Sequence, residues 1–217
     1  MRDFDHFSPE AVAFLSDLRQ NNNREWFTAY KSYYEETVKK PAGHFGKVMS
    51  RALETLTGTA HDHKLYRIYR DVRFSKDKTP YNAHIHLSFA SSGAPAKAPM
   101  WFFGLDSERL TLGCGIFQFD KPGLELFRSE MAGPRGATLM ALAARLRAKA
   151  IRVPDPALKR VPAGFDKDHP HAEALRHKGF SGWKDIADTD FVVRPDLAAR
   201  TIAEFSELMP IYRFFTR

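Results

Sequence analysis

Residues 67–86 read RIYRDVRFSKDKTPYNAHIH, and this basic segment decides how the middle of the chain is interpreted. From Tyr66 onward the residue pattern has a period of two. This period is typical of a β-strand, because successive side chains point to opposite faces of a sheet. The pattern predicts a strand over 66–74, a turn SKDKTPYN at 75–82 and a second strand over 83–89. Such a strand–turn–strand unit would hold the charges of the segment on a rigid scaffold.

Two more strands are predicted after this unit. The loop SSGAPAKAP (91–99) leads to the apolar runs MWFFGLD (100–106) and RLTLGCGIFQF (109–119), which are joined by a tight turn at Ser107-Glu108. Connections this short favour antiparallel pairing of neighbouring strands. The region 66–119 is therefore predicted to form an antiparallel sheet of four or more strands.

Helices are predicted before the sheet, over residues 8–57. Ser8 is expected to cap the first helix, and Asn23 is expected to cap a second helix that begins at Arg24. Pro41 then breaks or kinks the second helix, because proline lacks the N–H that an interior helical position donates. A third helical stretch follows it.

The remainder of the chain, 120–217, is predicted to be mainly helical. Its predicted elements are a helix capped by Asp120, a helix over 135–150, a loop with a short helix over 164–180, a strand over 191–194 and a final helix over 195–208. Runs of strands flanked by runs of helices indicate the α+β class. We therefore predict one α+β domain over 1–217, with N-terminal and C-terminal helices packed on the sheet.

Composition narrows the classes of protein to consider. The chain has 217 residues, of which 43% are hydrophobic, and this is enough for one well-packed domain. The net charge of +7 makes an acidic small molecule or a nucleic acid a reasonable partner. The single cysteine, Cys114, forms no internal disulfide and is expected to be a small buried residue, which fits a reducing compartment.

No targeting or membrane segment is evident. The N-terminal residues MRDFDHFSPE contain no apolar core of a secretory signal, and no stretch approaches the eighteen apolar residues of a membrane span. A cytoplasmic protein without a membrane partner is therefore expected. The oligomeric state stays open.

The basic segment carries six cations and only two anions between Lys64 and Tyr81. On the predicted strand one face would carry Arg67, Tyr69, Asp71 and Arg73. Arginine forks match the geometry of carboxylate and phosphate, and Asp71 could orient one of the guanidinium groups. Two lysines of the turn, Lys76 and Lys78, would close over a ligand, and Tyr81 would offer a phenol beside them. This face predicts an anion site.

The alternative is an ordinary charged strand face whose side chains are solvated and paired with one another. Arg70 would then point to the apolar side and need a carboxylate partner. The helices offer four candidates for that partner: Asp5, Asp17, Glu25 and Glu35. Whether Arg70 is functional or belongs to a buried structural ion pair stays open at this point.

Histidines provide the metal and base candidates. His84 and His86 are two residues apart, so on a strand they would point the same way and could bind one metal ion. The sequence identifies no third ligand, and two histidines hydrogen-bonded within a polar face are the alternative. Asp71, His84 and His86 are the candidate catalytic bases. No nucleotide-binding or serine-hydrolase motif is present, and no cofactor is expected.

Three motifs together resemble a known family: NNNREWF (21–27), RIYRDVRFSKDKTPYNAHI (67–85) and GFDKDHPHAEALRHKGF (164–180). They are similar to the widespread bacterial and fungal family catalogued as domain of unknown function 2461. The resemblance covers nearly the whole chain and implies a cytosolic, single-domain protein with no agreed catalytic residues. It also implies that the motifs converge. The candidates for one pocket are Asn22, Arg24, Arg67, Arg70, Asp71, Arg73, Lys76, Lys78, Tyr81, His169 and Arg176.

Three functions fit the sequence. The first is a basic pocket for a small phosphate- or carboxylate-bearing ligand, with or without catalysis at Asp71 or a histidine. The second is a nucleic-acid-binding module that uses the same basic face, since Tyr66, Tyr69, Phe74 and Tyr81 are interleaved with the basic residues and bases stack on exposed rings. The third is a structural or partner-binding domain in which the arginines are all paired internally.

Overall fold

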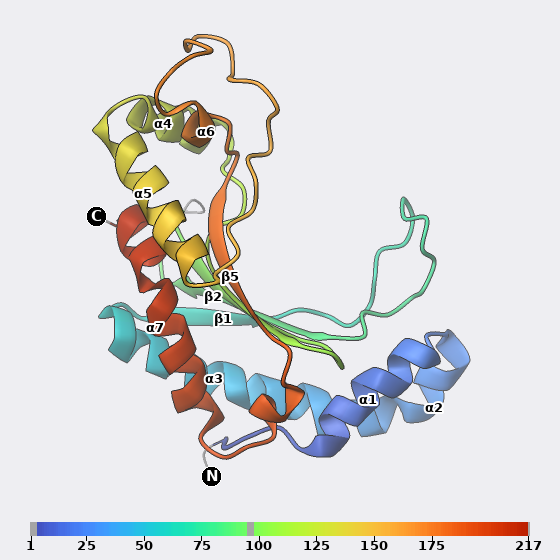
Figure 1. Ribbon diagram of the computed structural model, residues 1–217. Coiled ribbons are helices and arrows are strands. Elements are labelled where there is room, and N and C mark those ends of the chain that lie inside the picture. The colour runs from blue at the N-terminus through green and yellow to red at the C-terminus, as the bar shows by residue number, and fades with distance from the viewer. Residues whose placement is uncertain (1–3, 95–97, 217) are drawn as a thin grey trace. The chain divides into compact units, whose positions relative to one another are not determined.

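The computed structural model describes residues 4–94 and 98–216 and has an α+β architecture (Figure 1). Three strands of its sheet were predicted in place or nearly so, as was the antiparallel character of the sheet. The strands are β1 (His61–Leu65), β2 (Ile85–Ser91), β3 (Met100–Leu105), β4 (Leu110–Ile116) and β5 (Phe180–Ile186). They form one five-stranded sheet in the order β1-β2-β3-β4-β5. Strands β1 and β2 are antiparallel, with His61 opposite Ser91 and Leu65 opposite Leu87.

The first two helices begin where their sequences predict. Helix α1 (Pro9–Gln20) has Ser8 at its N-cap position, although the Ser8 side chain makes no capping hydrogen bond. Helix α2 (Arg24–Tyr34) is capped by Asn23, whose side-chain oxygen accepts from the backbone N–H of Trp26 at 2.9 Å. This bond satisfies one of the unpaired amides of the first turn.

Pro41 widens the helix instead of breaking it. A π-helix (Glu35–Lys39) follows α2 directly, and α3 (Lys40–Thr57) begins with Pro41 in its first turn. The backbone N–H of Lys40 donates to the carbonyl of Glu35, five residues earlier. A proline cannot donate the bond that a regular helix needs, so the pitch changes just before it. The end of α3 is set by Gly58, which has φ 75°.

The predicted strand over 66–74 is wrong. Residues 66–84 form a loop, here called the β1–β2 loop, which in Figure 1 (blue-green) extends away from the ends of both strands. It contains a single isolated bridge, between Tyr69 and Tyr81. Only Ile68 is buried between residues 66 and 80, so a strand here would have no apolar face to bury. The first strand lies earlier, at β1, where His61 is buried.

A second strand prediction is also wrong. Residues Thr189–Val192 form a 3₁₀ helix, started by Asp188, whose side chain accepts from the backbone N–H of Asp190. This local bond favours a turn over an extended strand. The fifth strand is instead β5, which begins at the last residue of the predicted loop and short helix (164–180) and continues through residues for which no element was predicted.

The C-terminal helices follow the sequence closely. Helix α4 (Lys121–Met131) is capped by Asp120, which accepts from the backbone N–H of Gly123 at 2.8 Å. Helices α5 (Pro134–Ala148) and α6 (Ala172–Leu175) also lie where they were expected. The last helix, α7 (Leu197–Thr216), passes through Pro210 and continues beyond the predicted end at Leu208. No helix in the described ranges is long and apolar enough to span a membrane.

The chain divides into two compact units that interleave along the sequence. The first contains Met1–Ser92, Phe102–Leu112 and Asp185–Ser206, and the second contains the intervening segments and the C-terminus. The chain therefore passes from one unit to the other just after β2 and within β3, β4, β5 and α7. The grouping of both units into one domain stays a prediction.

Each unit has its own aromatic core. In the first, the rings of Phe7, Phe45 and Phe103 all contact one another, with centroids 4.7 to 6.4 Å apart. In the second, Trp101 stacks on Tyr212 at 5.4 Å. Cys114 is fully buried there as expected, and burial raises the pKa of its thiol.

Two glycines of α3 provide a matched test of this packing. A methyl group on Gly46 would lie 2.4 Å from the Cδ2 atom of His63 on β1, whereas nothing lies within 4 Å of one on Gly43. We expect Gly46→Ala to lower the free energy of unfolding by about 1–3 kcal/mol through overpacking. Gly43→Ala should raise it by up to about 1 kcal/mol, because alanine is the better helix former. Urea unfolding measures both, and equal effects of the two substitutions would contradict this packing.

Candidate functional site

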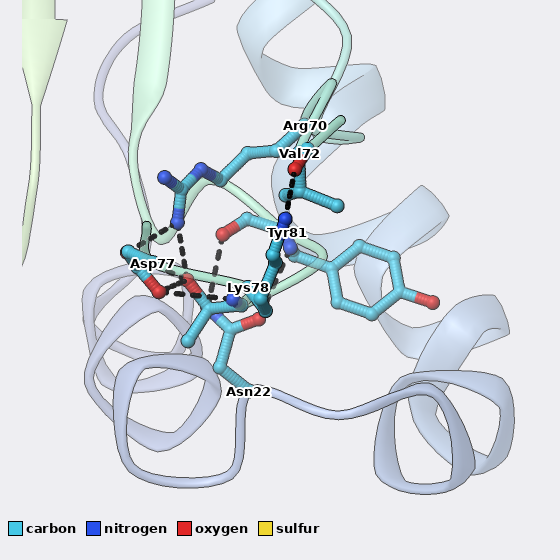
Figure 2. Close-up of polar contacts among 7 residues, drawn as sticks. Asn22, Arg70, Val72, Asp77, Lys78 and Tyr81 are labelled. Atoms are coloured by element: carbon cyan, nitrogen blue, oxygen red, sulfur yellow. Dashed lines mark hydrogen bonds and ion pairs between the residues drawn. The ribbon is translucent and has the colours of Figure 1, made fainter. Parts of the chain in front are cut away.

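Asn22 holds the β1–β2 loop against the turn between α1 and α2 (Figure 2). Its amide nitrogen donates to the carbonyl oxygen of Tyr81 at 2.9 Å, and its amide oxygen accepts from the N–H of Tyr81 at 3.0 Å. The Tyr81 ring stacks on Phe27 of α2, with the centroids 4.1 Å apart. Tyr81 is only 6% exposed, and burial raises the pKa of its phenol. Asn22 and Tyr81 are thus brought together, as the sequence predicts, but they act as an anchor for the loop.

Arg70 is paired within the loop itself. One of its terminal nitrogens lies 2.6 Å from a carboxylate oxygen of Asp77 and also donates to the hydroxyl of Thr79. None of the four helical carboxylates proposed from the sequence is its partner, because the loop provides a carboxylate of its own. Figure 2 shows the Tyr81 ring pointing away from this pair.

The Asp77 carboxylate is the most strongly stabilised anion of the loop. The backbone N–H of Thr79 donates to it at 2.9 Å, and Arg70 and the Thr79 hydroxyl also bind it. These contacts lower its pKa from 3.8 to about 2, with the Thr79 N–H as the largest cause. Lys78 closes the loop from the other side by donating to the carbonyl of Val72 at 3.0 Å.

Asp71 and Arg73 form a second pair, exposed to solvent. Two guanidinium nitrogens of Arg73 lie 2.9 and 2.7 Å from the two carboxylate oxygens of Asp71. The prediction that Asp71 orients a guanidinium is therefore confirmed for Arg73. The same contact lowers the pKa of Asp71, which makes this carboxylate a weaker base.

A polar hollow of about 450 Å³ lies where the loop meets the end of α1 and the turn between β3 and β4. Its lining residues are Arg19, Asn22, Arg70, Thr79, Tyr81, Asn82, Ala83, His84, Asp106, Glu108 and Arg109. Four of them, Asn22, Arg70, Tyr81 and His84, are candidates from the sequence. This hollow is the candidate site.

The turn between β3 and β4 provides the charges that sequence reasoning missed. Asp106 accepts from the backbone N–H groups of Glu108 and Arg109 at 2.7 and 2.9 Å, which fixes the turn. Arg19 of α1 pairs with Glu108 at 2.6 Å. Within residues 4–94 and 98–216, the guanidinium of Arg109 has no hydrogen-bond or ion-pair partner.

A sequence signal for this turn did exist. In an antiparallel sheet the start of one strand lies beside the end of the next, so the end of β3 lies beside the start of β2 and the turn after β3 has to approach His84. Recognising Ser107-Glu108 as a tight turn was therefore enough to place Arg109 near the start of β2. Arg19 gave no comparable signal, because its place depends on how α1 packs.

His84 and His86 lie together as their spacing predicts. Their rings stack with centroids 3.8 Å apart. Burial lowers the pKa of both, that of His86 to about 4, with the neighbouring His84 as the second cause. Both imidazoles are therefore neutral near pH 7. The described part of the chain contains no group of three His, Cys, Asp or Glu side chains that could hold a metal ion, so the pair has no third ligand there.

The other sequence candidates do not line the hollow. Arg24, Arg67 and Lys76 are exposed on α2 and the loop. His169 and Arg176 belong to the second unit, where His169 accepts from the N–H of His171 at 3.0 Å and Arg176 donates to the carbonyl of Lys159 at 3.5 Å. That these residues share one pocket with the first unit stays a prediction.

Comparison with known proteins supports the resemblance seen in the three motifs. A family model described as "Conserved hypothetical protein (DUF2461)" matches residues 10–214, which is most of the chain. The comparison with curated proteins found no match to the chain.

The Asn22 anchor can be tested by mutation. Asn22→Ala removes both hydrogen bonds to Tyr81 and leaves a partly buried N–H and C=O unpaired, so we expect the free energy of unfolding to fall by about 1–3 kcal/mol. Asn21→Ala is the control, because the Asn21 amide donates only to the carbonyl of Asp17 at the surface. Urea unfolding measures both. A loss no greater than that of the control would show that Asn22 does not anchor the loop.

The two carboxylates of the loop can be distinguished by NMR titration. In Arg70→Gln the pKa of Asp77 should rise above 2 yet stay below 3.8, because the Thr79 N–H remains its largest stabilising contact. Arg73→Gln should instead raise the pKa of Asp71 and leave Asp77 unchanged. A carboxylate with a lowered pKa adds stability above its unfolded pKa and loses it as the pH falls through the folded value. The Asp77 contribution should therefore disappear between about pH 4 and 2.

Proposed function

The chain belongs to the DUF2461 family, whose description names no activity, and we propose from the site itself that the hollow binds a small molecule bearing a phosphate or carboxylate group. The carrying observation is Arg109, which lines the hollow together with Arg70 and His84 and whose guanidinium has no hydrogen-bond or ion-pair partner within the described residues. A planar guanidinium binds carboxylate and phosphate through two parallel hydrogen bonds. A volume of about 450 Å³ also suits a small molecule.

The charge balance of the hollow favours a small anion. Arg19 is neutralised by Glu108, and Arg70 by Asp77. Arg109 is thus the cation that a ligand can use without displacing an existing ion pair. The Asp106 carboxylate lies on the same lining and would accept a hydrogen bond from a hydroxyl or amine of the ligand.

The proposal is for binding, because the candidate bases are not tuned for catalysis near neutral pH. An efficient general base has a pKa close to the working pH. The pKa of Asp71 is lowered by Arg73, and that of His86 is lowered to about 4 by burial. Of the three candidate bases, only His84 lines the hollow, and burial lowers its pKa as well.

The nucleic-acid alternative uses different side chains. Arg67, Arg73 and Lys76 lie on the β1–β2 loop outside the hollow. A small anion in the hollow and a nucleic acid on the outer loop are therefore separate proposals, and each needs its own variant. The structural alternative follows if neither is bound.

A thermal-shift comparison tests the hollow. Inorganic phosphate, glycerol 3-phosphate and citrate at millimolar concentration should raise the Tm of the wild type, since a ligand at a hundred times its Kd adds about 2.7 kcal/mol. Arg109→Ala should abolish the shift by removing the free guanidinium. Arg73→Ala is the matched control, because Arg73 is an exposed arginine paired with Asp71 outside the hollow. The proposal fails if no anion stabilises the wild type, or if Arg109→Ala responds as the control does.

A further inference from the structure

The β1–β2 loop exposes aromatic rings to solvent along its first half. Phe74 is 96% exposed, Tyr69 48% and Tyr66 41%. A phenylalanine that is almost fully exposed buries none of its apolar surface in the fold. Large apolar side chains left in water at one place mark a surface that contacts something else.

Cations accompany these rings. The guanidinium of Arg73 lies 5.9 Å from the centroid of the Phe74 ring, and the ammonium of Lys64 lies 4.8 Å from that of Tyr66. Arg67 and Lys76 are exposed on the same loop, and neither forms an ion pair within the described residues. Two of the exposed rings, those of Tyr66 and Phe74, therefore each have a cation beside them.

Tyr69 is held in place by two aromatic rings that contact one side of it. Its ring contacts those of Tyr81 and Phe27 at 5.4 and 5.9 Å, and Tyr81 is itself fixed by Asn22. Nearly half of its surface is still open. A ring that is anchored on one side and open on the other needs little ordering when a partner stacks on it.

We propose that this surface, formed by Tyr66, Arg67, Tyr69, Arg73, Phe74 and Lys76, binds single-stranded nucleic acid. Exposed rings stack on unpaired bases of any sequence, and Arg67 and Lys76, which have no ion-pair partner within the described residues, neutralise phosphates. Arg73 keeps its pair with Asp71 beside the Phe74 ring. The net charge of +7 attracts a polyanion over a longer range. A duplex has its bases already stacked and offers these rings nothing to stack on. The inference does not depend on a small anion in the hollow, because none of these six residues lines it.

Another exposed ring of the same unit provides the contrast. Tyr33 on α2 is 45% exposed, close to the values for Tyr66 and Tyr69. It lines a different hollow together with the carboxylates of Asp5, Glu10 and Glu36. A phosphate backbone would be repelled there, so Tyr33 is a matched control for ring exposure without positive charge.

Fluorescence anisotropy with a labelled oligothymidine tests the proposal. The wild type should bind it at low salt, with an affinity that falls steeply as salt increases, and should bind a duplex of the same length more weakly. Phe74→Ala should weaken binding about tenfold by removing one stacking platform. Phe74→Trp should retain the affinity, and Tyr33→Ala should leave it unchanged.

Four results would overturn the proposal. The wild type could fail to bind oligothymidine at low salt, or it could bind the duplex equally well, which would leave electrostatics without stacking. Phe74→Ala could bind as the Tyr33→Ala control does, which would place the binding surface elsewhere. Binding to phosphatidylserine vesicles without binding to oligothymidine would assign the loop to a membrane surface instead.

Discussion

The two hydrogen bonds between the Asn22 side chain and the backbone of Tyr81 determine where the β1–β2 loop lies. The loop has few apolar contacts of its own, since only Ile68 and Tyr81 of residues 66–84 are buried. With Tyr81 fixed and stacked on Phe27, the chain on either side of it is placed as well. Arg70 and Thr79 then reach the hollow, and Tyr69 is supported from behind. The side chain of Asn22 thus pairs with the backbone of Tyr81 as a neighbouring strand would, and this pairing positions both the hollow and the exposed rings of the loop.

The charges of the loop contribute more to its conformation than to its stability. Asp71 pairs with Arg73 and Asp77 with Arg70, so both carboxylates are used within the loop. Exposed ion pairs of this kind add little free energy, because water solvates the separated charges almost as well. They do decide which cations are left over. Once the two pairs are formed, Arg67 and Lys76 of the loop have no ion-pair partner within the described residues, and neither has Arg109 of the turn between β3 and β4.

Sequence reasoning succeeded where structure is set locally and failed where it is set by distant contacts. The starts of α2 and α4 were predictable because Asn23 and Asp120 bond to amides three residues away. The strand over 66–74 was wrong because its alternation consists largely of charged residues, which a loop exposes equally well. Strand β1 was missed because HDHKL is polar, although His61 is buried in the fold. In the site, Asn22 and Arg70 were candidates because they lie in the sequence motifs. The position of Arg19 depends instead on how α1 packs, and that of Arg109 on how β2 and β3 pair.

The passage of the chain between its two units limits which parts of its gene correspond to a complete structural unit. Each unit is assembled from three separate segments, and the changes from one to the other fall just after β2 and inside β3, β4, β5 and α7. No single cut therefore releases either unit as a continuous piece, and no simple gene fusion can transfer one without the other. The family match over residues 10–214 accordingly covers segments of both. No contiguous stretch of the gene therefore encodes one unit alone.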